Sequence, residues 1–313
     1  MKILFTGGSS FTGFWFVQYL AAAGHEIVCT ATADLNSYTD VRRERIENLR
    51  PFCTFVPNSP FGSEAFLKVA NQGKFDLFAH HAAEVTDYKS ESFDAVAALQ
   101  NNTLNVRAAL LALKCPVVLT GTVYENDEGA GSEPLSAFSP YGLSKGLTFQ
   151  VFRFYCQHAG IPLGKFVIPN PFGPYEEPRF TAYLMRTWSQ GKTAEVKTPD
   201  YIRDNIHADL LAAVYVKFVN EIGQTRNRLV KINPSGYTGS QGEFTKRIAQ
   251  EVKARTGWAC ELKLCPQTDF SEPLHRQNPC PAVSLVSGWN EQKAWDAFVD
   301  FYTAKRPSHN PVG

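Results

Sequence analysis

Hydrophobic residues fall into short continuous runs through the first two-thirds of the chain, and stretches of helical spacing separate these runs. Runs of this length are typical of strands buried on both faces of a sheet. The expected strands are 2–7, 26–32, 53–58, 75–83, 116–122, 164–170 and 228–233. The stretches with apolar residues at helical spacing are 12–23, 40–49, 63–72, 92–113 and 141–159.

This alternation predicts an α/β fold, a doubly wound parallel sheet (Rossmann fold) with helices on both faces. After residue 170, Pro and Gly become frequent and long loops separate the helices, which indicates a smaller, discontinuous C-terminal substrate lobe. We expect the dinucleotide-binding Rossmann domain to span 1–168, with 204–233 returning to it. The substrate lobe takes 169–203 and 234–313, and the final HNPVG is expected to be frayed.

The composition is that of an ordinary soluble globular protein, with 313 residues, 44% hydrophobic and 19% charged residues and a net charge of +1. No basic excess suggests a nucleic-acid partner, and no apolar run reaches the length of a membrane span. The chain opens on a strand rather than on a signal peptide, and its seven cysteines are scattered without a C-x-x-C pair. We therefore expect a cytoplasmic protein with free thiols and no membrane partner.

A turn rich in small residues, TGGSSFTG (6–13), separates the first strand from the first helix. Small residues let the backbone approach a pyrophosphate, and the helix N-terminus stabilises its charge. A plain Gly/Ser turn is the alternative, which the position in the first strand–helix unit disfavours. Ser10 stands where a middle glycine is usual, so the motif is slightly degraded. The expected phosphate contacts are Gly7, Ser9, Ser10, Phe11, Thr12 and Gly13.

The end of the second strand, CTATADLNSY (29–38), bears on the choice between NAD and NADP. A carboxylate at this place bonds the free 2′-hydroxyl of NAD and repels the 2′-phosphate of NADP. Ala31 and Thr32 occupy it here, and they leave room for a phosphate. Asp34 would supply the carboxylate if the strand ended three residues later.

Three arginines, Arg42, Arg43 and Arg45, follow shortly downstream and are able to pair with such a phosphate. A solvated helix face explains them equally well. We expect NADP to be favoured over NAD, with Thr32 and Arg42 among the contacts.

Tyr141 and Lys145 stand four residues apart in SPYGLSK (139–145), at the start of an expected helix. Residues at this spacing share one helix face. A lysine ammonium favours the ionised form of a nearby tyrosine, whose unperturbed pKa is about 10. With 12 tyrosines in the chain, such a pair arises by chance about once in two chains of average lysine content. Thr120 and Thr122 end the fifth strand, at the sheet edge where ligands bind.

Together these stretches resemble an extended short-chain dehydrogenase/reductase of the NAD-dependent epimerase/dehydratase family, in its nucleotide-sugar-modifying branch. The resemblance runs nearly from end to end, and several motifs in the family's order are far more specific than any one. The matching stretches are TGGSSFTG, FDLFAHHAA (75–83), NNTLN (101–105), LTGTVYE (119–125), SPYGLSK, PNPFGPY (169–175) and RDNIHADL (203–210).

The resemblance implies that Thr120, Tyr141 and Lys145 are the catalytic triad, and that Lys145 also bonds the nicotinamide ribose. It places two further groups of residues around the ligands. The implied cofactor contacts are His81, Ala82 and Ala83. The substrate contacts are Asn170 and Arg203, with Thr122 and Arg276 added by position alone. Because neighbours on a strand point to opposite faces, at most one of His80 and His81 is expected to face the site.

The residues after Thr120 bear on the reaction. The 4,6-dehydratases that the chain resembles carry Asp-Glu there, whereas this chain has Gly121 and Thr122, neither of which is a general acid or base. Dehydration is therefore disfavoured. The absent carboxylate at Ala31 favours a 4-keto-sugar reductase that exchanges NADPH. The alternative is a nucleotide-sugar 4-epimerase, which uses the same triad and retains a tightly bound NAD.

Two other classes share part of the pattern. Non-catalytic nucleotide sensors have this fold but usually lose the Tyr–Lys pair. A reductase of hydrophobic ketones or alcohols would line its pocket with aromatic residues, although aromatics at these intervals are more often core; the set is Phe172, Phe180, Tyr183 and Trp188. No His, Cys, Asp or Glu cluster has metal-ligand spacing, so we expect no metal.

The resemblance also implies a homodimer, because this family often associates through a four-helix bundle formed by segments such as 92–113 and 141–159. Burial against the sheet explains the apolar faces of these helices equally well. The apolar residues concerned are Val96, Leu99, Leu110, Phe149 and Phe152.

Overall fold

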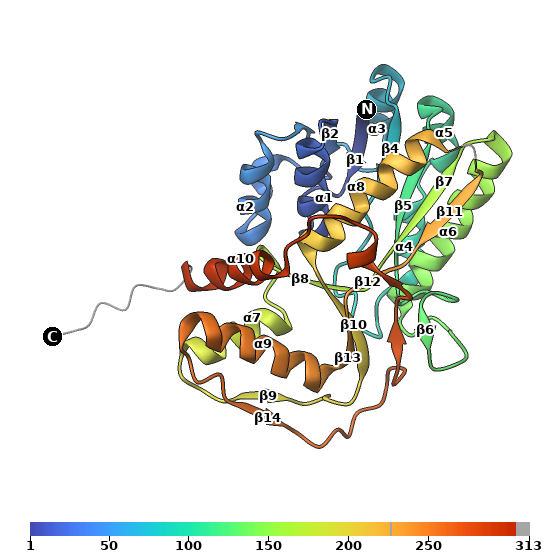
Figure 1. Cartoon of the computed structure of the whole chain (residues 1–313). Helices are drawn as coiled ribbons and strands as arrows, with labels where there is room; N and C mark the ends of the chain where they lie inside the picture. Colours follow the sequence, from blue (N-terminus) through green and yellow to red (C-terminus); the bar gives the residue numbers. More distant parts are fainter. Residues whose placement is uncertain (226, 305–313) are drawn as a thin grey trace.

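The structure is a computed structural model that describes residues 1–225 and 227–304, so the HNPVG end lies outside the described residues. Its centre is a seven-stranded parallel sheet with the order β11–β7–β5–β4–β1–β2–β3 (Figure 1). All seven apolar runs form this sheet, which confirms the predicted doubly wound fold. The strands are β1 (Lys2–Thr6), β2 (Glu26–Thr30), β3 (Thr54–Val56), β4 (Leu77–His80), β5 (Val117–Thr122), β7 (Leu163–Ile168) and β11 (Leu229–Ile232).

Helices cover both faces of the sheet, and a hydrophobic core lies under each layer. One layer contains α1 (Phe11–Ala22) and α8 (Ala208–Gln224), with α2 (Asp40–Leu49) beside α1. The other layer contains α3 (Glu64–Gln72), α5 (Val106–Leu113) and α6 (Pro140–Ala159). Strands buried on both faces must be apolar throughout, which accounts for the continuous runs in the sequence.

The helix expected over 92–113 is in fact two helices, α4 (Ala95–Asn102) and α5. Asn105 adopts the left-handed conformation between them, with φ of 49°. Its side-chain amide donates to the carbonyl oxygen of Gly62 at 2.9 Å. Asparagine tolerates this conformation better than most residues, and apolar spacing alone gives no sign of the break.

The smaller lobe begins where β7 and β11 end, at the carboxyl edge of the sheet (Figure 1). A three-stranded sheet with the order β13–β10–β8 forms its base. Its principal elements are β8 (Asn170–Phe172), α7 (Phe180–Ser189), β9 (Ala194–Val196), β10 (Ile202–His207), β13 (Tyr237–Ser240), α9 (Gln241–Thr256) and α10 (Glu291–Ala304). Short strands complete it: β6 (Ala130–Gly131), β12 (Pro234–Ser235), β14 (Leu262–Leu264), β15 (Arg276–Gln277) and β16 (Cys280–Pro281).

An aromatic core holds this lobe together. Phe172 and Trp188 are buried in it, and Phe180 and Tyr183 pack against it partly exposed. The interpretation of these four aromatics as core is therefore confirmed, and they give no support to a hydrophobic ketone site.

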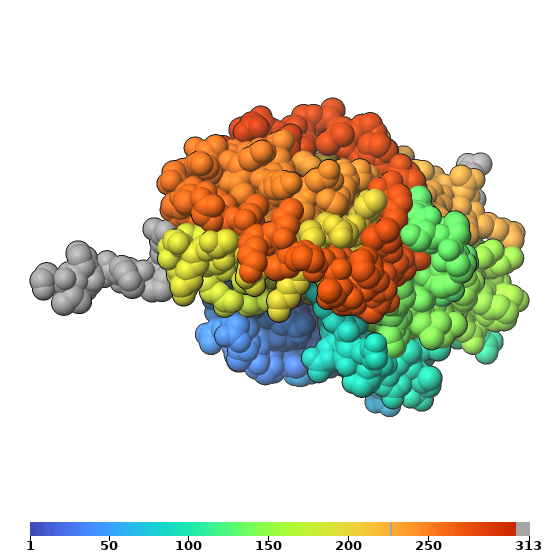
Figure 2. Space-filling model, turned by 90° about the horizontal axis from the view of Figure 1, so that it is seen from below, coloured from blue at the N-terminus to red at the C-terminus, as the bar shows by residue number. Residues whose placement is uncertain are grey.

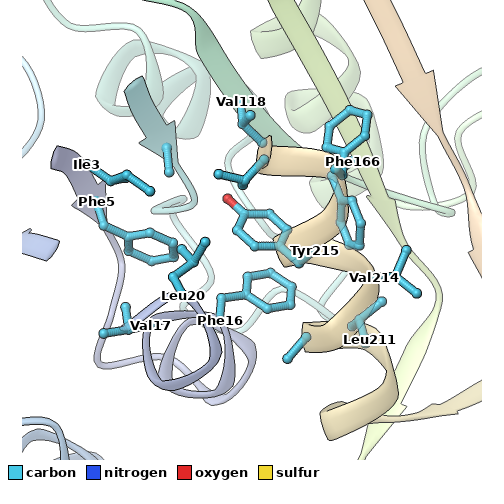
Figure 3. Close-up of a cluster of buried hydrophobic side chains, with 14 of the residues drawn as sticks. Ile3, Phe5, Phe16, Val17, Leu20, Val118, Phe166, Leu211, Val214 and Tyr215 are labelled. Carbon is cyan, nitrogen blue, oxygen red and sulfur yellow. The ribbon is translucent and has the colours of Figure 1, made fainter. Parts of the chain in front are cut away.

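Residues far apart in the sequence meet in the core under α1 and α8. Figure 3 shows side chains of β1, α1, β5, β7 and α8 interlocking there. Tyr215 of α8 stacks on Phe16 of α1, with ring centroids 3.9 Å apart and planes within 2°. β10 leads directly into α8, so the chain passes from the small lobe straight back into this layer.

Candidate active site

The turn between β1 and α1 is closely packed against the loop that follows β4. Gly7 has a φ of 82°, and a Cβ there would lie 2.8 Å from the backbone nitrogen of Ala82. A Cβ on Gly13 would lie 2.2 Å from the carbonyl oxygen of Gly7. Ser10 caps α1 by accepting from the Gly13 N–H at 3.2 Å. This all-backbone cradle at a helix N-terminus fits the pyrophosphate of a dinucleotide.

The strand that precedes the ribose position ends at Thr30, two residues before the expected end at 32. Ala31 is buried, and the Thr32 hydroxyl lies 3.0 Å from the Tyr38 hydroxyl. The Asp34 carboxylate accepts from the Asn36 N–H at 2.8 Å and caps a short 3₁₀ turn. Asp34 therefore has a local structural role, and no carboxylate stands at the end of β2.

The three arginines of α2 have three different environments. Arg45 is fully buried and donates to the carbonyl oxygens of Ser9 and Tyr175 and to the Glu177 carboxylate. Neither alternative raised for Arg45, a phosphate partner or a solvated helix residue, agrees with this placement, because its donors are engaged inside the protein. Arg43 pairs with Glu47 on the helix surface. Arg42 is exposed, and its charge contributes to lowering the pKa of Glu84.

Tyr141 and Lys145 lie one turn apart at the start of α6, as their spacing predicted. Ser139 accepts from the Gly142 N–H at 3.0 Å and Pro140 opens the helix, so this end of α6 is firmly defined. Lys145 is buried, and burial lowers the pKa of its ammonium to about 8. The charge of Glu125 opposes that shift.

Aromatic rings enclose Tyr141. The ring centroids of Tyr88, Phe93 and Tyr124 lie 5.2, 6.0 and 6.5 Å from its own. Burial first, and then the negative charge of Glu125, raise the pKa of the Tyr141 phenol. The protein alone thus favours the protonated phenol, and a nearby positive charge is needed to make it a base at neutral pH.

Thr120 is buried at the end of β5, and its hydroxyl lies 2.9 Å from Nδ1 of His81. His80 points to the opposite face, where its ring lies against Phe61 and Phe152. The expectation that at most one of the two histidines faces the site therefore agrees with their geometry. Ala82 follows His81 and donates its N–H to the Thr6 hydroxyl at 3.0 Å, with Ala83 next along the same loop.

A buried ion-pair cluster lies beside the Tyr–Lys pair, and the sequence analysis did not identify it. Lys165 Nζ is 2.6 Å from Glu125 Oε2, off the hydrogen-bond direction, and 2.7 Å from Glu128 Oε1. Glu125 also accepts from the Thr122 N–H at 2.7 Å. Glu125 ends the LTGTVYE motif and Glu128 follows it closely, but nothing local shows that they meet a lysine of β7.

The expected substrate residues lie at the base of the small lobe. Asn170 accepts from the Tyr124 hydroxyl at 3.2 Å and donates to the carbonyl oxygen of Asp204 at 3.0 Å. Arg203 pairs with Glu272 at 2.8 Å and donates to the Pro273 carbonyl oxygen. These contacts tie β8, β10 and the 272–274 segment together around the site.

Arg276 is completely buried. Its guanidinium donates to the carbonyl oxygens of Glu128 and Ser136, at 3.0 and 2.8 Å. This placement gives Arg276 a structural role, and its contact with a nucleotide stays a prediction.

Arg179 and Tyr88 also lie near the catalytic tyrosine, and the sequence analysis did not name them as site residues. The Arg179 guanidinium lies 5.3 Å from the centre of the Tyr88 ring, and its charge acts to lower the pKa of Tyr141. Both residues belong to loops rather than to motifs, so only their place in long loops near the pocket hinted at them. Figure 2 shows a hollow on this face, between the blue and cyan early segments and the yellow segment that follows β7.

Two negative findings apply to the described ranges. In residues 1–225 and 227–304, no three His, Cys, Asp or Glu side chains are grouped so as to hold a metal ion. None of the helices in the same ranges has the length and apolar character needed to cross a bilayer.

Comparison with known proteins supports the resemblance noted from the motifs. The model of the NAD dependent epimerase/dehydratase family matches residues 3–232, most of the chain. Among curated proteins, none matches the sequence.

Many solved structures share this fold. UDP-glucuronic acid 4-epimerase from Bacillus cereus, solved with UDP-glucuronic acid and NAD, is 19% identical with a TM-score of 0.74, covering 97% of this chain and 99% of its own. UDP-glucose-4-epimerase from Stenotrophomonas maltophila, with bound NAD, is 17% identical with a TM-score of 0.76, covering 97% and 98%. The dTDP-glucose 4,6-dehydratase of Streptomyces venezuelae is 18% identical with a TM-score of 0.75, covering 98% of both chains. At these identities the likeness establishes the fold.

Proposed function

Because the chain belongs to the NAD-dependent epimerase/dehydratase family, we propose that it is a nucleotide-sugar 4-epimerase that retains NAD. The presence of the family's three residues supports this proposal: Thr120 and Lys145 are buried, and aromatic rings enclose Tyr141. Epimerisation needs no other acid or base. Several of the similar structures are 4-epimerases solved with NAD, which favours this activity over the 4-keto reduction expected from the sequence.

The surroundings of Gly121 argue against dehydration. A Cβ on Gly121 would lie 2.8 Å from Glu125 Oε1 and 2.8 Å from Cε of Lys165. This position therefore faces the buried ion-pair cluster and leaves no room for an acidic side chain. Glu125 itself is wholly buried and paired with Lys165, so it does not replace the missing acid.

The proposed role of Tyr141 is to take the proton of the sugar hydroxyl and later return it. Lys145, together with the positive ring of a bound oxidised nicotinamide, would supply the positive charge that lowers the energy of the phenolate. Thr120 contacts the same sugar oxygen, and the Tyr124–Asn170 pair borders the sugar. A bound nicotinamide would accept and return the hydride. The phosphate turn and the loop at 81–83 would hold that cofactor.

A 4-keto-sugar reductase using NADPH is the second candidate, and the ribose end of the site favours it. No carboxylate stands at Ala31, and Thr32 presents a hydroxyl. Arg42 is exposed close to Glu84 and makes no ion pair with another residue in the described ranges. A 2′-phosphate would find room and a positive charge there.

The nucleotide that the purified protein retains tests the two candidates. Denaturing release and mass spectrometry should find about one NAD per chain after dialysis if the protein is an epimerase. An empty site that binds NADPH well ahead of NADH would overturn the epimerase and support the reductase.

Replacing the catalytic tyrosine separates both enzymes from a nucleotide sensor. Tyr141→Phe should retain nucleotide and lose at least about a hundredfold in turnover, because it removes the acid–base group. Tyr124→Phe is the control, since it loses only a hydroxyl bonded to Asn170 and should chiefly raise KM. Full activity in Tyr141→Phe would exclude the proposed chemistry.

We also propose that the protein is a homodimer that pairs through α4 and α6. The residues first considered for this role, such as Phe149 and Phe152, are buried against the sheet. Val96 of the first set is exposed, and three further apolar residues are exposed on α6: Leu143, Leu147 and Phe154. Light scattering should show a dimer that Leu147→Glu dissociates and that Leu274→Glu, an exposed leucine of the small lobe, leaves intact. A monomeric wild type would refute the interface.

A further inference from the structure

One imidazole lies between the phosphate turn and the catalytic threonine. His81 follows the last residue of β4. Its Nε2 lies 3.0 Å from the Ser10 hydroxyl and 3.1 Å from the Thr12 hydroxyl. Its Nδ1 lies 2.9 Å from the Thr120 hydroxyl. The two ends of the proposed site, one for cofactor phosphate and one for substrate, thus meet on opposite nitrogens of one side chain.

The hydroxyl of Ser10 decides which nitrogen carries the proton. Ser10 donates its only hydroxyl proton to the Gly7 carbonyl oxygen, 2.8 Å away, and accepts from the Gly13 N–H. It can therefore only accept from Nε2 of His81. The proton of the neutral ring must lie on Nε2, and Nδ1 must be the acceptor of the Thr120 O–H.

The other tautomer leaves a repulsive contact. If Nε2 accepted the Ser10 proton, the Ser10 oxygen would face the Gly7 carbonyl oxygen at 2.8 Å with no hydrogen between them. If Nε2 accepted from Thr12 instead, Ser10 Oγ and Nε2 would meet at 3.0 Å as two acceptors. Only the Nε2–H form satisfies all of these contacts at once.

The ring also stays neutral. Burial, with a further contribution from the Lys145 ammonium, lowers the pKa of His81 to about 3. A doubly protonated ring would in addition turn Nδ1 into a donor. Tyr215, whose hydroxyl faces Thr120 off the strict hydrogen-bond direction, closes the other side of that residue.

We propose that His81 is a positioning residue that draws the hydroxyl proton of Thr120 onto its Nδ1, so that Thr120 meets the substrate as a hydrogen-bond acceptor. The proposal rests on the proposed function for the identity of the site. A sugar hydroxyl can donate its one proton to the Thr120 oxygen when it binds, and it must turn that proton to Tyr141 before the transfer. A ketone oxygen finds no proton on Thr120. Through this contact the site favours the bound alcohol over the bound ketone. The chain Ser10–His81–Thr120 also makes the position of Thr120 depend on the phosphate turn.

Nitrogen NMR of the ¹⁵N-histidine-labelled protein as purified, with no substrate added, tests the tautomer directly. The signals of His81 are those that disappear in His81→Gln. They should show a protonated Nε2 and an unprotonated Nδ1, unchanged between pH values on either side of the ordinary histidine pKa of about 6.5. A protonated Nδ1, or titration near that value, would overturn the proposal.

Two further variants test which neighbour of His81 fixes its tautomer. Thr120→Val removes the donor to Nδ1 and should shift the Nδ1 signal while Nε2 stays protonated. Ser10→Ala removes the acceptor that fixes Nε2–H and should give a mixture of tautomers. A Thr120→Val protein that switches tautomer, or a Ser10→Ala protein that keeps it fully, would contradict the assigned chain of contacts.

Replacing His81 with Gln or Asn tests the contacts of its two ring nitrogens one at a time. In His81→Gln the amide nitrogen can still donate to Ser10, and in His81→Asn the amide oxygen can still accept from Thr120. His81→Gln should keep NAD affinity within about threefold and slow the reduction of bound NAD by UDP-glucose about tenfold, as expected for one lost hydrogen bond. His81→Asn should keep the rate of NAD reduction within about threefold and weaken NAD binding about tenfold. Equal losses in both variants would reduce His81 to a packing residue.

The outcomes distinguish this proposal from the proposed function. A protein that never reduces NAD with any nucleotide sugar, yet shows the Nε2–H form, would refute the enzyme and keep the hydrogen-bond chain. An active epimerase with the Nδ1–H form would refute the chain alone.

Discussion

Glu125 and Lys165 place two opposite charges in the interior beside the proposed catalytic pair. A buried ion pair is seldom a source of stability, since desolvation offsets most of its attraction. Its effect here is on the pKa values of its neighbours. Burial lowers the pKa of Lys145 to about 8 and the Glu125 carboxylate opposes this, so Glu125 helps to keep Lys145 charged at neutral pH.

Removing the charge of Glu125 should move the pH dependence of the reaction. Glu125 raises the pKa of both Tyr141 and Lys145, and an uncharged glutamine lowers both. Glu125→Gln should therefore shift the rising and falling limbs of kcat/KM to lower pH, by about one unit. A pH–rate profile measures this shift. The side-chain amide oxygen introduced by Glu125→Gln can still accept from the Thr122 N–H, so this hydrogen bond is kept.

Glu128→Gln is the matched control. It pairs with the same Lys165 ammonium, but the charges that shift the pKa of Tyr141 and Lys145 include Glu125 and not Glu128. Its pH profile should stay within experimental error of the wild type. Equal shifts in both variants would mean that the loss of any partner of Lys165 perturbs the site.

Glu176 gives the protein a pH-dependent stability of its own. Burial raises the pKa of its carboxyl to about 7, while Thr181 donates to it at 2.5 Å. Because its pKa is raised, the Glu176 carboxyl binds more proton in the folded state than in the unfolded state. The free energy of unfolding therefore falls as pH rises from about 4.5 to 7. Glu176→Gln keeps the acceptor and should exceed wild-type stability by about 3 kcal/mol at pH 8 and match it at pH 4. Urea unfolding at both pH values measures this, and an equal difference at both would contradict it.

At the scale of elements, two glycines in helices should respond in opposite ways to the same added methyl group. A Cβ on Gly13 meets the Gly7 carbonyl oxygen at 2.2 Å, whereas on Gly146 the nearest atom is 3.9 Å away. Gly13→Ala should distort the phosphate turn and abolish NAD binding. Gly146→Ala should stabilise α6 by about 0.5–1 kcal/mol, because alanine is the better helix former. Calorimetry and nucleotide titration of both variants test this, and normal NAD binding by Gly13→Ala would refute the assigned turn.

The sequence was sufficient to predict every strand of the main sheet and most of its helices. Buried parallel strands produce continuous apolar runs, and amphipathic helices repeat apolar residues at helical spacing, so both can be recognised in the sequence. The break between α4 and α5 cannot be recognised in this way. It depends on the left-handed backbone of Asn105 and on its hydrogen bond to Gly62, more than forty residues earlier. Tyr141 and Lys145 were singled out because their spacing is local, and the family resemblance added Thr120 to them. Lys165 joins that site only through strand order.

At the scale of the whole molecule, Arg45 joins the phosphate turn to the small lobe. Its buried guanidinium contacts the Ser9 carbonyl oxygen on one side and Tyr175 and Glu177 on the other. Both readings of Arg45 from the sequence, a phosphate partner and a solvated helix residue, assumed an accessible side chain. Only the folded chain shows that the 175–177 loop covers it.

Breaking this contact should affect stability far more than its position on α2 suggests. Arg45→Met leaves Glu177 with a weaker partner and two carbonyl oxygens unsatisfied, so we expect a loss of about 3–5 kcal/mol. Arg43→Met, two residues away and paired only at the surface, should cost less than about 1 kcal/mol. Chemical denaturation compares the two, and similar losses would show that Arg45 is not a link between the lobes.

The late arrival of α8 and β11 has a consequence for synthesis on the ribosome. β7 is complete at residue 168, but its outer neighbour β11 begins at residue 229, and α8 fills the core beside α1 only shortly before. At about 5–20 residues per second, the nascent chain waits roughly 3–12 seconds with the outer edge of β7 unpaired and the aromatic face of α1 exposed. An open strand edge next to exposed apolar side chains is what chaperones bind and what aggregates recruit. Production of this protein is therefore most vulnerable in that interval, before its final fold exists.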